Sequence, residues 1–172
     1  MAWKIMKYLK EWNNWISTSS TGVPVELDYK SSDKITYNNH KIILTNGGKS
    51  IEVLAKFDTG AKSSSIDFGV AEKLGFSEDM LNKCKQLQTI KIPQTISDLE
   101  KTKMELQISR FLKKEFPEIS KVKIVKSSSG TSVRAFIRLK LTYIGRTITT
   151  NVNLRDRAGL KCEMLVGLDD ML

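Results

Sequence analysis

Residues 57–61 read Phe-Asp-Thr-Gly-Ala, and this stretch decides which fold the chain of 172 residues is expected to adopt. The aspartate follows an apolar run that ends at Phe57, and Gly60 allows the backbone to turn sharply after it. A carboxylate among apolar neighbours loses hydration and needs hydrogen-bond donors in return. The stretch therefore indicates an acid at a strand end that serves a chemical purpose.

The residue types around Asp58 suit the chemistry of aspartic peptidases. In those enzymes two carboxylates share one proton and hold a water: one acts as base on the water, while the other polarises the scissile carbonyl. Gly60 leaves room for the water, and Thr59 offers a hydroxyl that can be buried against a counterpart. We expect Asp58, Thr59 and Gly60 to be catalytic. Ala61 keeps the approach narrow and is expected to contact substrate.

An isolated Asp-Thr-Gly is a weak signal, because Asp and Gly are common in turns, so the context of Asp58 matters. Residues 41–45 and 49–57 show partial alternation around a turn signal at Asn46-Gly47-Gly48, which predicts a β-hairpin. Asp58 then lies at the end of the second strand. Helical spacing before a glycine predicts a helix over residues 68–75.

A second hairpin is predicted downstream. Residues 134–143 and 147–154 alternate with period two around a turn at 144–146. An apolar strand that starts at Cys162 then breaks at Gly167 into a short helical segment. Together with the first hairpin, these strands predict a mainly β fold.

These motifs, taken in order, resemble a known family. The resemblance is carried by DTGA with Ser64 and Ile66, the turn Ser128-Ser129-Gly130, Arg134, the stretch 153–157 and Met164-Leu165-Val166-Gly167. They are similar to the bacterial and phage retropepsin-like family labelled ATP-dependent zinc proteases, whose members are associated with ATP-grasp glutamate ligases. The segment 164–169 is also similar to retropepsin-like domains of DNA-damage-inducible proteins and retroelement proteases. The resemblance covers residues 41–75 and 122–172.

The resemblance implies a retropepsin-like closed barrel, the acid protease fold, within residues 23–172. It implies that Asp58 is the catalytic acid, that the turn at 127–131 is a flap over substrate, and that 165–167 threads behind the Asp loop. The residues expected to bind substrate are Ala61, Ser128, Ser129, Gly130 and Arg134.

One Asp-Thr-Gly per chain implies a symmetric homodimer, because the shared-proton mechanism needs two carboxylates. Asp169 is a weaker candidate for an internal second acid. The expected function is an aspartic endopeptidase that hydrolyses peptide bonds with a water held between two Asp58 side chains, without a cofactor. Retropepsins continue past their glycine segment with a helix and a dimer-forming strand, whereas this sequence ends at Leu172. A non-catalytic retropepsin-like binding or assembly module is therefore the alternative.

The formal net charge of +9 bears on the partners of the protein. Lys and Arg are spread along the chain, without a motif that interleaves them with stacking aromatics, so no specific nucleic acid is expected. Relatives are implicated in trimming glutamate-rich tails, so the resemblance implies an acidic peptide or protein substrate. Arg134, Arg155 and Arg157 are the first residues to test. The last two could equally be structural, pairing with acids or capping carbonyls.

Two segments lie outside the minimal barrel. Residues 1–16 place Trp and Lys at amphipathic spacing, which predicts a helix that packs on the barrel or on a second subunit, with a membrane-surface anchor as the second choice, and 17–22 is expected to be a linker. The sequence has no secretory signal or membrane span, so a soluble, cytoplasmic protein is expected.

Residues 96–116 predict a helical insertion, taken as about 96–117, that packs outside the sheet near the flap. Ser97 and Glu100 form a capping box, and Pro117 ends the helix. Its apolar side is expected to contain Leu99, Leu106, Phe111 and Leu112.

Despite the zinc in the family label, no metal site is expected. His40, Cys84 and Cys162 are the only His and Cys residues of the chain, and they cannot supply a tetrahedral site. His40 is interpreted as a polar residue at a strand start. The cysteines are interpreted as separate thiols in a reducing compartment.

Overall fold

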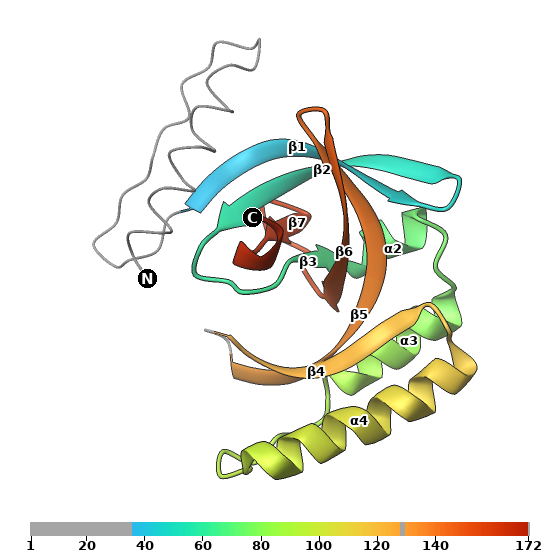
Figure 1. The fold of residues 1–172 in the computed structure, drawn as a ribbon, viewed down its shortest axis with the longest axis vertical. Helices are drawn as coiled ribbons and strands as arrows, with labels where there is room; N and C mark the ends of the chain where they lie inside the picture. Colours follow the sequence, from blue (N-terminus) through green and yellow to red (C-terminus); the bar gives the residue numbers. More distant parts are fainter. Residues whose placement is uncertain (1–35, 128–129, 172) are drawn as a thin grey trace.

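The structure is a computed structural model that describes residues 36–127 and 130–171. The predicted N-terminal helix and linker lie outside the described residues, as do Ser128 and Ser129. The chain is mainly β (Figure 1). Its elements are β1 (Thr36–Asn46), β2 (Lys49–Asp58), β3 (Ser65–Asp67), α2 (Phe68–Lys73), α3 (Glu78–Leu87), α4 (Asp98–Glu115), β4 (Ile119–Ser127), β5 (Gly130–Tyr143), β6 (Arg146–Arg155), β7 (Met164–Val166) and the short 3₁₀ helix η1 (Leu168–Asp170).

Six of the strands close into a barrel. The strand order is β1-β2-β7-β3-β6-β5-β4, and an additional pairing of β1 with β5 closes the ring and leaves β4 as an extra strand beside β5. β2 runs parallel to β7, and β3 runs parallel to β6, whereas the hairpin partners are antiparallel. Figure 1 shows the long β5 curving around the barrel, with β7 and η1 near its centre. The predicted mainly β class with a closed barrel is confirmed.

Both predicted hairpins are present. Asn46 pairs with Lys49 around a two-residue turn whose first residue, Gly47, has a φ of 56°. In the second hairpin Tyr143 pairs with Arg146, so the predicted place of Arg146 in the turn is wrong: it is the first residue of β6. The turn consists of Ile144 and Gly145, with φ values of 45° and 71°, as a type I′ turn requires.

The core follows from the alternation along these strands. In β1 the side chains of Ile42 and Leu44 are fully buried, while Ile43 between them is exposed. The same alternation in β2 buries Val53, Ala55 and Phe57. Successive side chains of a strand point to opposite faces, so one set fills the barrel interior and the other meets solvent or helices.

Two short helices follow β3. The predicted helix over 68–75 is observed as α2, which is capped by Asp67 and is followed by Gly75 with a φ of 92°. The next helix, α3, was not predicted. Its signals are present in the sequence: Ser77 accepts the backbone N–H of Met80 at the start of the helix, and the buried residues recur at helical spacing, namely Met80, Leu81, Cys84 and Leu87.

The predicted insertion helix is observed as α4, including the capping box of Ser97 and Glu100. The predicted apolar side is wrong at three positions: the side chains of Leu99, Leu106 and Phe111 are 65%, 51% and 67% exposed, and only Leu112 is buried. The helix contacts β4, the strand that leads to the predicted flap turn, as expected for a helix outside the sheet.

A buried carboxylate explains the orientation of α4. Glu105 is 6% exposed; its Oε1 accepts the backbone N–H of Ile124 at 2.9 Å, and its Oε2 accepts a hydrogen bond from Lys123 at 3.0 Å. An unpaired buried backbone N–H is costly, so the face of α4 that bears Glu105 turns toward β4. Met104 and Ile108 pack beside it against the core.

Candidate active site

The Asp58 turn lies at the end of β2, as predicted. The side chain of Asp58 is 4% exposed, and its Oδ1 accepts the backbone N–H of Gly60 at 2.8 Å. The N–H of Ala61 donates to the carbonyl oxygen of Asp58 at 3.1 Å, which closes the turn. Thr59 and Ala61 are half-buried and Gly60 is exposed, so the turn keeps one side open to solvent.

The segment after β7 runs against this turn. The N–H of Leu168 donates to the carbonyl oxygen of Ala61, and that of Asp169 to the carbonyl oxygen of Lys62, each at 2.9 Å. A Cβ on Gly167 would lie 2.6 Å from the carbonyl carbon of Ser63, so only glycine fits there. Residues 165–167 therefore pass directly beside the Asp loop, as the resemblance implied.

A second buried carboxylate, that of Asp170, stands behind the turn. It accepts hydrogen bonds from the hydroxyls of Ser64 and Thr150, and the Ser64 oxygen in turn accepts the N–H of Gly167 at 3.0 Å. Burial raises the pKa of Asp170, against the opposite effect of the two hydroxyl donors. Asp169, the weaker candidate for a second acid, is exposed.

The predicted flap corresponds to the β4–β5 hairpin. Ser127 pairs with Gly130 across its end, and the Ser127 hydroxyl donates to the Gly130 carbonyl oxygen at 3.1 Å. Gly130 is exposed, with a φ of 115°. The predicted substrate-binding residues Ser128 and Ser129 lie outside the described residues.

Arg134 lies at the base of this hairpin and is 6% exposed. Its guanidinium donates to Ser132 Oγ at 2.9 Å, to Asn153 Oδ1 at 3.2 Å and to Ser127 Oγ at 3.4 Å. All three acceptors are neutral. Burial, with the nearby charges of Arg155 and Arg157, lowers the pKa of Arg134 to about 10. The hairpin base thus holds a buried cation whose hydrogen-bond partners carry no charge.

Asn153 connects the hairpin base to the loop that follows the Asp58 turn. While its Oδ1 accepts from Arg134, its Nδ2 donates to the carbonyl oxygen of Ser64 at 2.8 Å and to Ser63 Oγ at 3.3 Å. Sequence reasoning gave Asn153 no role. The signal available in the sequence was a polar residue between the apolar Val152 and Leu154. In the structure all three of these residues are buried, so the alternation of β6 stops there.

Arg157 fits the structural alternative, in which arginine caps carbonyl groups. Its Nε donates to the carbonyl oxygen of Cys162 at 3.1 Å, and its backbone N–H donates to Asp67 Oδ1 at 2.7 Å. Burial is the main cause that lowers the pKa of Arg157, and the charges of Asp67 and Asp58 act in the opposite direction. Arg155 is half-buried at the end of β6.

His40 lies inside β1, which begins four residues earlier at Thr36, so its predicted place at a strand start is wrong. The Tyr143 hydroxyl and His40 Nδ1 form a hydrogen bond of 2.8 Å, and the His40 ring lies 5.0 Å from that of Phe57. Burial lowers the pKa of His40 and raises that of Tyr143 to about 12. This cluster supports the strand that presents Asp58.

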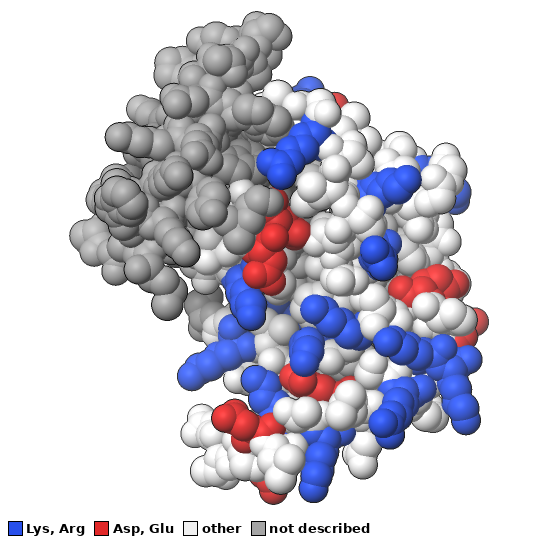
Figure 2. Space-filling view, viewed as in Figure 1, with Lys and Arg blue, Asp and Glu red and all other residues white. Residues whose placement is uncertain are grey.

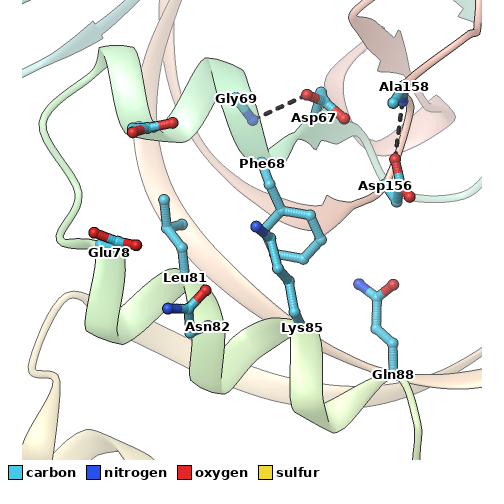
Figure 3. A pocket seen from close by; sticks show the side chains of 11 residues that line it. Asp67, Phe68, Gly69, Glu78, Leu81, Asn82, Lys85, Gln88, Asp156 and Ala158 are labelled. Atoms are coloured by element: carbon cyan, nitrogen blue, oxygen red, sulfur yellow. Dashed lines mark hydrogen bonds between the residues drawn. The ribbon is translucent and has the colours of Figure 1, made fainter.

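A separate cavity of about 520 Å³ lies between α2, α3 and the segment after β6 (Figure 3). Figure 3 shows Lys85 reaching over the ring of Phe68, at 5.4 Å from its centroid. The lining residues are Asp67, Phe68, Gly69, Glu72, Glu78, Leu81, Asn82, Lys85, Gln88, Asp156 and Ala158. They include no residue of the Asp58 turn, so this cavity is distinct from the candidate site.

Within residues 36–127 and 130–171, no group of three or more His, Cys, Asp or Glu side chains is placed to hold a metal ion. Cys84 and Cys162 are both buried and are not joined in a disulfide, and burial raises the pKa of Cys84 to about 12. None of the described helices is long and apolar enough to cross a membrane.

The sequence was compared with models of protein families and with curated proteins, and neither comparison finds a match.

Proposed function

We propose that this chain is a retropepsin-like aspartic endopeptidase that acts as a homodimer. Three features support the proposal: the closed barrel, the buried Asp58 in a glycine turn at the end of β2, and the β4–β5 hairpin whose base is linked to the loop after that turn. The observation that carries it is the burial of Asp58 in a turn that stays open on one side, because a carboxylate placed this way can hold a reactive water.

In the proposed reaction, two Asp58 carboxylates face each other across a two-fold axis and share one proton. The ionised carboxylate removes a proton from the water, which attacks the peptide carbonyl, while the protonated one donates a hydrogen bond to the carbonyl oxygen. The N–H of Gly60 holds Oδ1 of its own Asp58 and fixes the direction of the carboxylate. The tetrahedral intermediate then collapses: its C–N bond breaks, and the carboxyl that took the proton from the water gives a proton to the leaving amine.

The β4–β5 hairpin would close over the bound peptide. Its base is tied through Arg134 and Asn153 to Ser63 and Ser64, which follow the Asp58 turn. A shift of the hairpin is therefore transmitted to the loop that positions the carboxylate. This connection supports a role for Arg134 at the substrate site, although its partners in the structure are side chains of the protein.

An acidic peptide is the proposed substrate. The chain carries a net charge of +9, and Figure 2 shows Lys and Arg over much of one face of the molecule. Arg155 and Arg157 lie near enough to Arg134 for their charges to lower its pKa, so a substrate carboxylate that approached this group of cations would be stabilised. The buried thiols of Cys84 and Cys162, which are not joined in a disulfide, support a reducing, cytoplasmic location.

The test is digestion of a library of acidic and neutral peptides by the full chain and by Asp58→Asn, at several values between about pH 4 and pH 7. The proposal predicts cleavage by the wild type, a dimeric mass in solution and no cleavage by the variant. Binding of acidic peptides without hydrolysis would favour the non-catalytic module. Hydrolysis that survives in Asp58→Asn would contradict the proposed mechanism.

A further inference from the structure

Helix α4 has an outer face that the barrel does not use. Its inner side meets the barrel through Met104, Glu105, Ile108 and Leu112. On the opposite side, residues at every third or fourth position form a continuous exposed stripe. We call this stripe the outer face of α4, and it consists of Leu99, Lys103, Leu106, Arg110, Lys113 and Lys114.

The outer face combines large apolar side chains with positive charge. Leu99 and Leu106 are 65% and 51% exposed, and Phe111, which is 67% exposed, lies at the edge of the stripe. The four remaining residues of the stripe are cations, and none is an acid. A single exposed leucine needs no explanation, but two exposed leucines on a stripe with four cations, with an exposed phenylalanine at its edge, indicate a binding surface.

The composition of the outer face selects among possible occupants. A second copy of the chain would bring four cations against four cations, which is unfavourable. Nucleic acid would use the cations but would set Leu99 and Leu106 against phosphates and sugars, which give apolar side chains nothing to bury against. An anionic lipid surface uses both kinds of residue, because leucine enters the acyl boundary while Lys and Arg reach the headgroups.

We propose that the outer face of α4 is a peripheral binding surface for anionic lipid membranes. The helix has 18 residues and is exposed along its whole outer side, so it can lie flat in the headgroup layer. Glu105 anchors the same helix to β4, so the barrel is attached to the membrane through the strand that leads to the β4–β5 hairpin. This inference does not depend on peptidase activity.

The test is co-sedimentation of the full chain with vesicles of phosphatidylcholine alone and of phosphatidylcholine with about 30% phosphatidylserine. Wild type is expected to bind the anionic vesicles, to dissociate from them as the salt concentration is raised, and not to bind the neutral vesicles. Two variants address the two components of the surface: Leu99→Ser with Leu106→Ser, and Lys103→Glu with Arg110→Glu. Each is expected to weaken binding at least about ten-fold.

Control variants place a single change of each kind elsewhere on the surface. Leu160→Ser removes another leucine of similar exposure, 52%, and Lys140→Glu reverses an exposed cation of β5. Both are expected to bind vesicles nearly as wild type does, and circular dichroism checks that all variants fold. Binding that is equal in wild type and in both α4 variants would overturn the proposal. So would retention on poly-glutamate, lost in the α4 variants, without any vesicle binding, because it would assign the surface to an acidic protein.

Discussion

Asp58 ends β2, and Asp170 ends the short η1 that follows its paired strand β7; both side chains are buried, but they have different hydrogen-bond partners. Asp58 receives a backbone N–H from the exposed Gly60 of its own turn, whereas Asp170 is enclosed by hydroxyls from Ser64 and Thr150, which lie on other segments. The exposed fraction does not separate the two acids, since it is 4% for Asp58 and 8% for Asp170. The difference lies in their neighbours: Asp58 adjoins the exposed Gly60, whereas the partners of Asp170 join separate segments of the chain. We infer that Asp58 is the chemical residue and Asp170 the structural one.

The largest effect that separates the two acids is on hydrolysis. Asp58→Asn is expected to lower kcat for peptide cleavage by at least about a thousand-fold, because an amide cannot share the proton, while the free energy of unfolding changes little. The matched control is Asp169→Asn, which alters an exposed acid on the neighbouring segment and should retain the rate. A comparable loss in the Asp169 variant would identify it as the second acid and remove the need for a dimer.

Gly167→Ala tests how tightly the segment beside the Asp loop is packed. The added methyl would lie 2.6 Å from the Ser63 carbonyl carbon, so the backbone must shift. We expect a loss of about 2 to 4 kcal/mol in the free energy of unfolding measured with urea. Gly48→Ala is the control, since its added methyl meets nothing within 4 Å. Equal stability of the two variants would contradict this packing.

Asp170→Ala tests the structural half of the comparison. It leaves the hydroxyls of Ser64 and Thr150 without their acceptor and is expected to lower the free energy of unfolding by about 2 kcal/mol. Peptides that are cleaved by wild type should still be cleaved by folded Asp170→Ala. A variant that is stable but inactive would show that Asp170 takes part in the chemistry.

Glu105 extends the comparison to a third buried carboxylate, which fixes a helix to a strand. Glu105→Ala removes the acceptor of the Ile124 N–H and is expected to cost about 1 to 3 kcal/mol in urea unfolding. Glu105→Gln keeps an acceptor for that N–H and should cost less. If both variants were as stable as wild type, α4 would be held to β4 by apolar contacts alone.

The smallest effect is a pH dependence of stability. The pKa of the Asp170 carboxyl is raised above its ordinary value of 3.8 in the folded chain. The folded chain therefore binds the proton of Asp170 more tightly than the unfolded chain does. The proton therefore stabilises the fold at low pH, and this contribution is lost as the pH rises through the folded pKa. Asp170→Asn is expected to remove that part of the slope of unfolding free energy against pH. An unchanged slope would mean that Asp170 titrates as it does in the unfolded chain.

The two hairpins could be predicted because each is defined locally: alternation identifies the strands, and Gly47 and Gly145 mark the turns. The closed barrel was implied only by the resemblance, because its closure depends on a pairing between strands distant in sequence, β1 with β5. The orientation of α4 could not be predicted, because it depends on a contact between Glu105 and a backbone N–H of β4 that is distant in sequence. The candidate site likewise has a part that the sequence predicts and a part that depends on distant contacts. The Asp58 turn is a local motif, whereas Asn153 and Asp170 gain their roles from partners on other strands.

Activity in mixed dimers tests the central claim most directly. Wild type and Asp58→Asn are refolded together in varying proportion at constant total concentration, and the rate of peptide cleavage is measured. If each site needs Asp58 from both subunits, the rate falls with the square of the wild-type fraction, because mixed dimers are inactive. A rate that falls in simple proportion to the wild-type fraction would show that one chain suffices and would contradict the account.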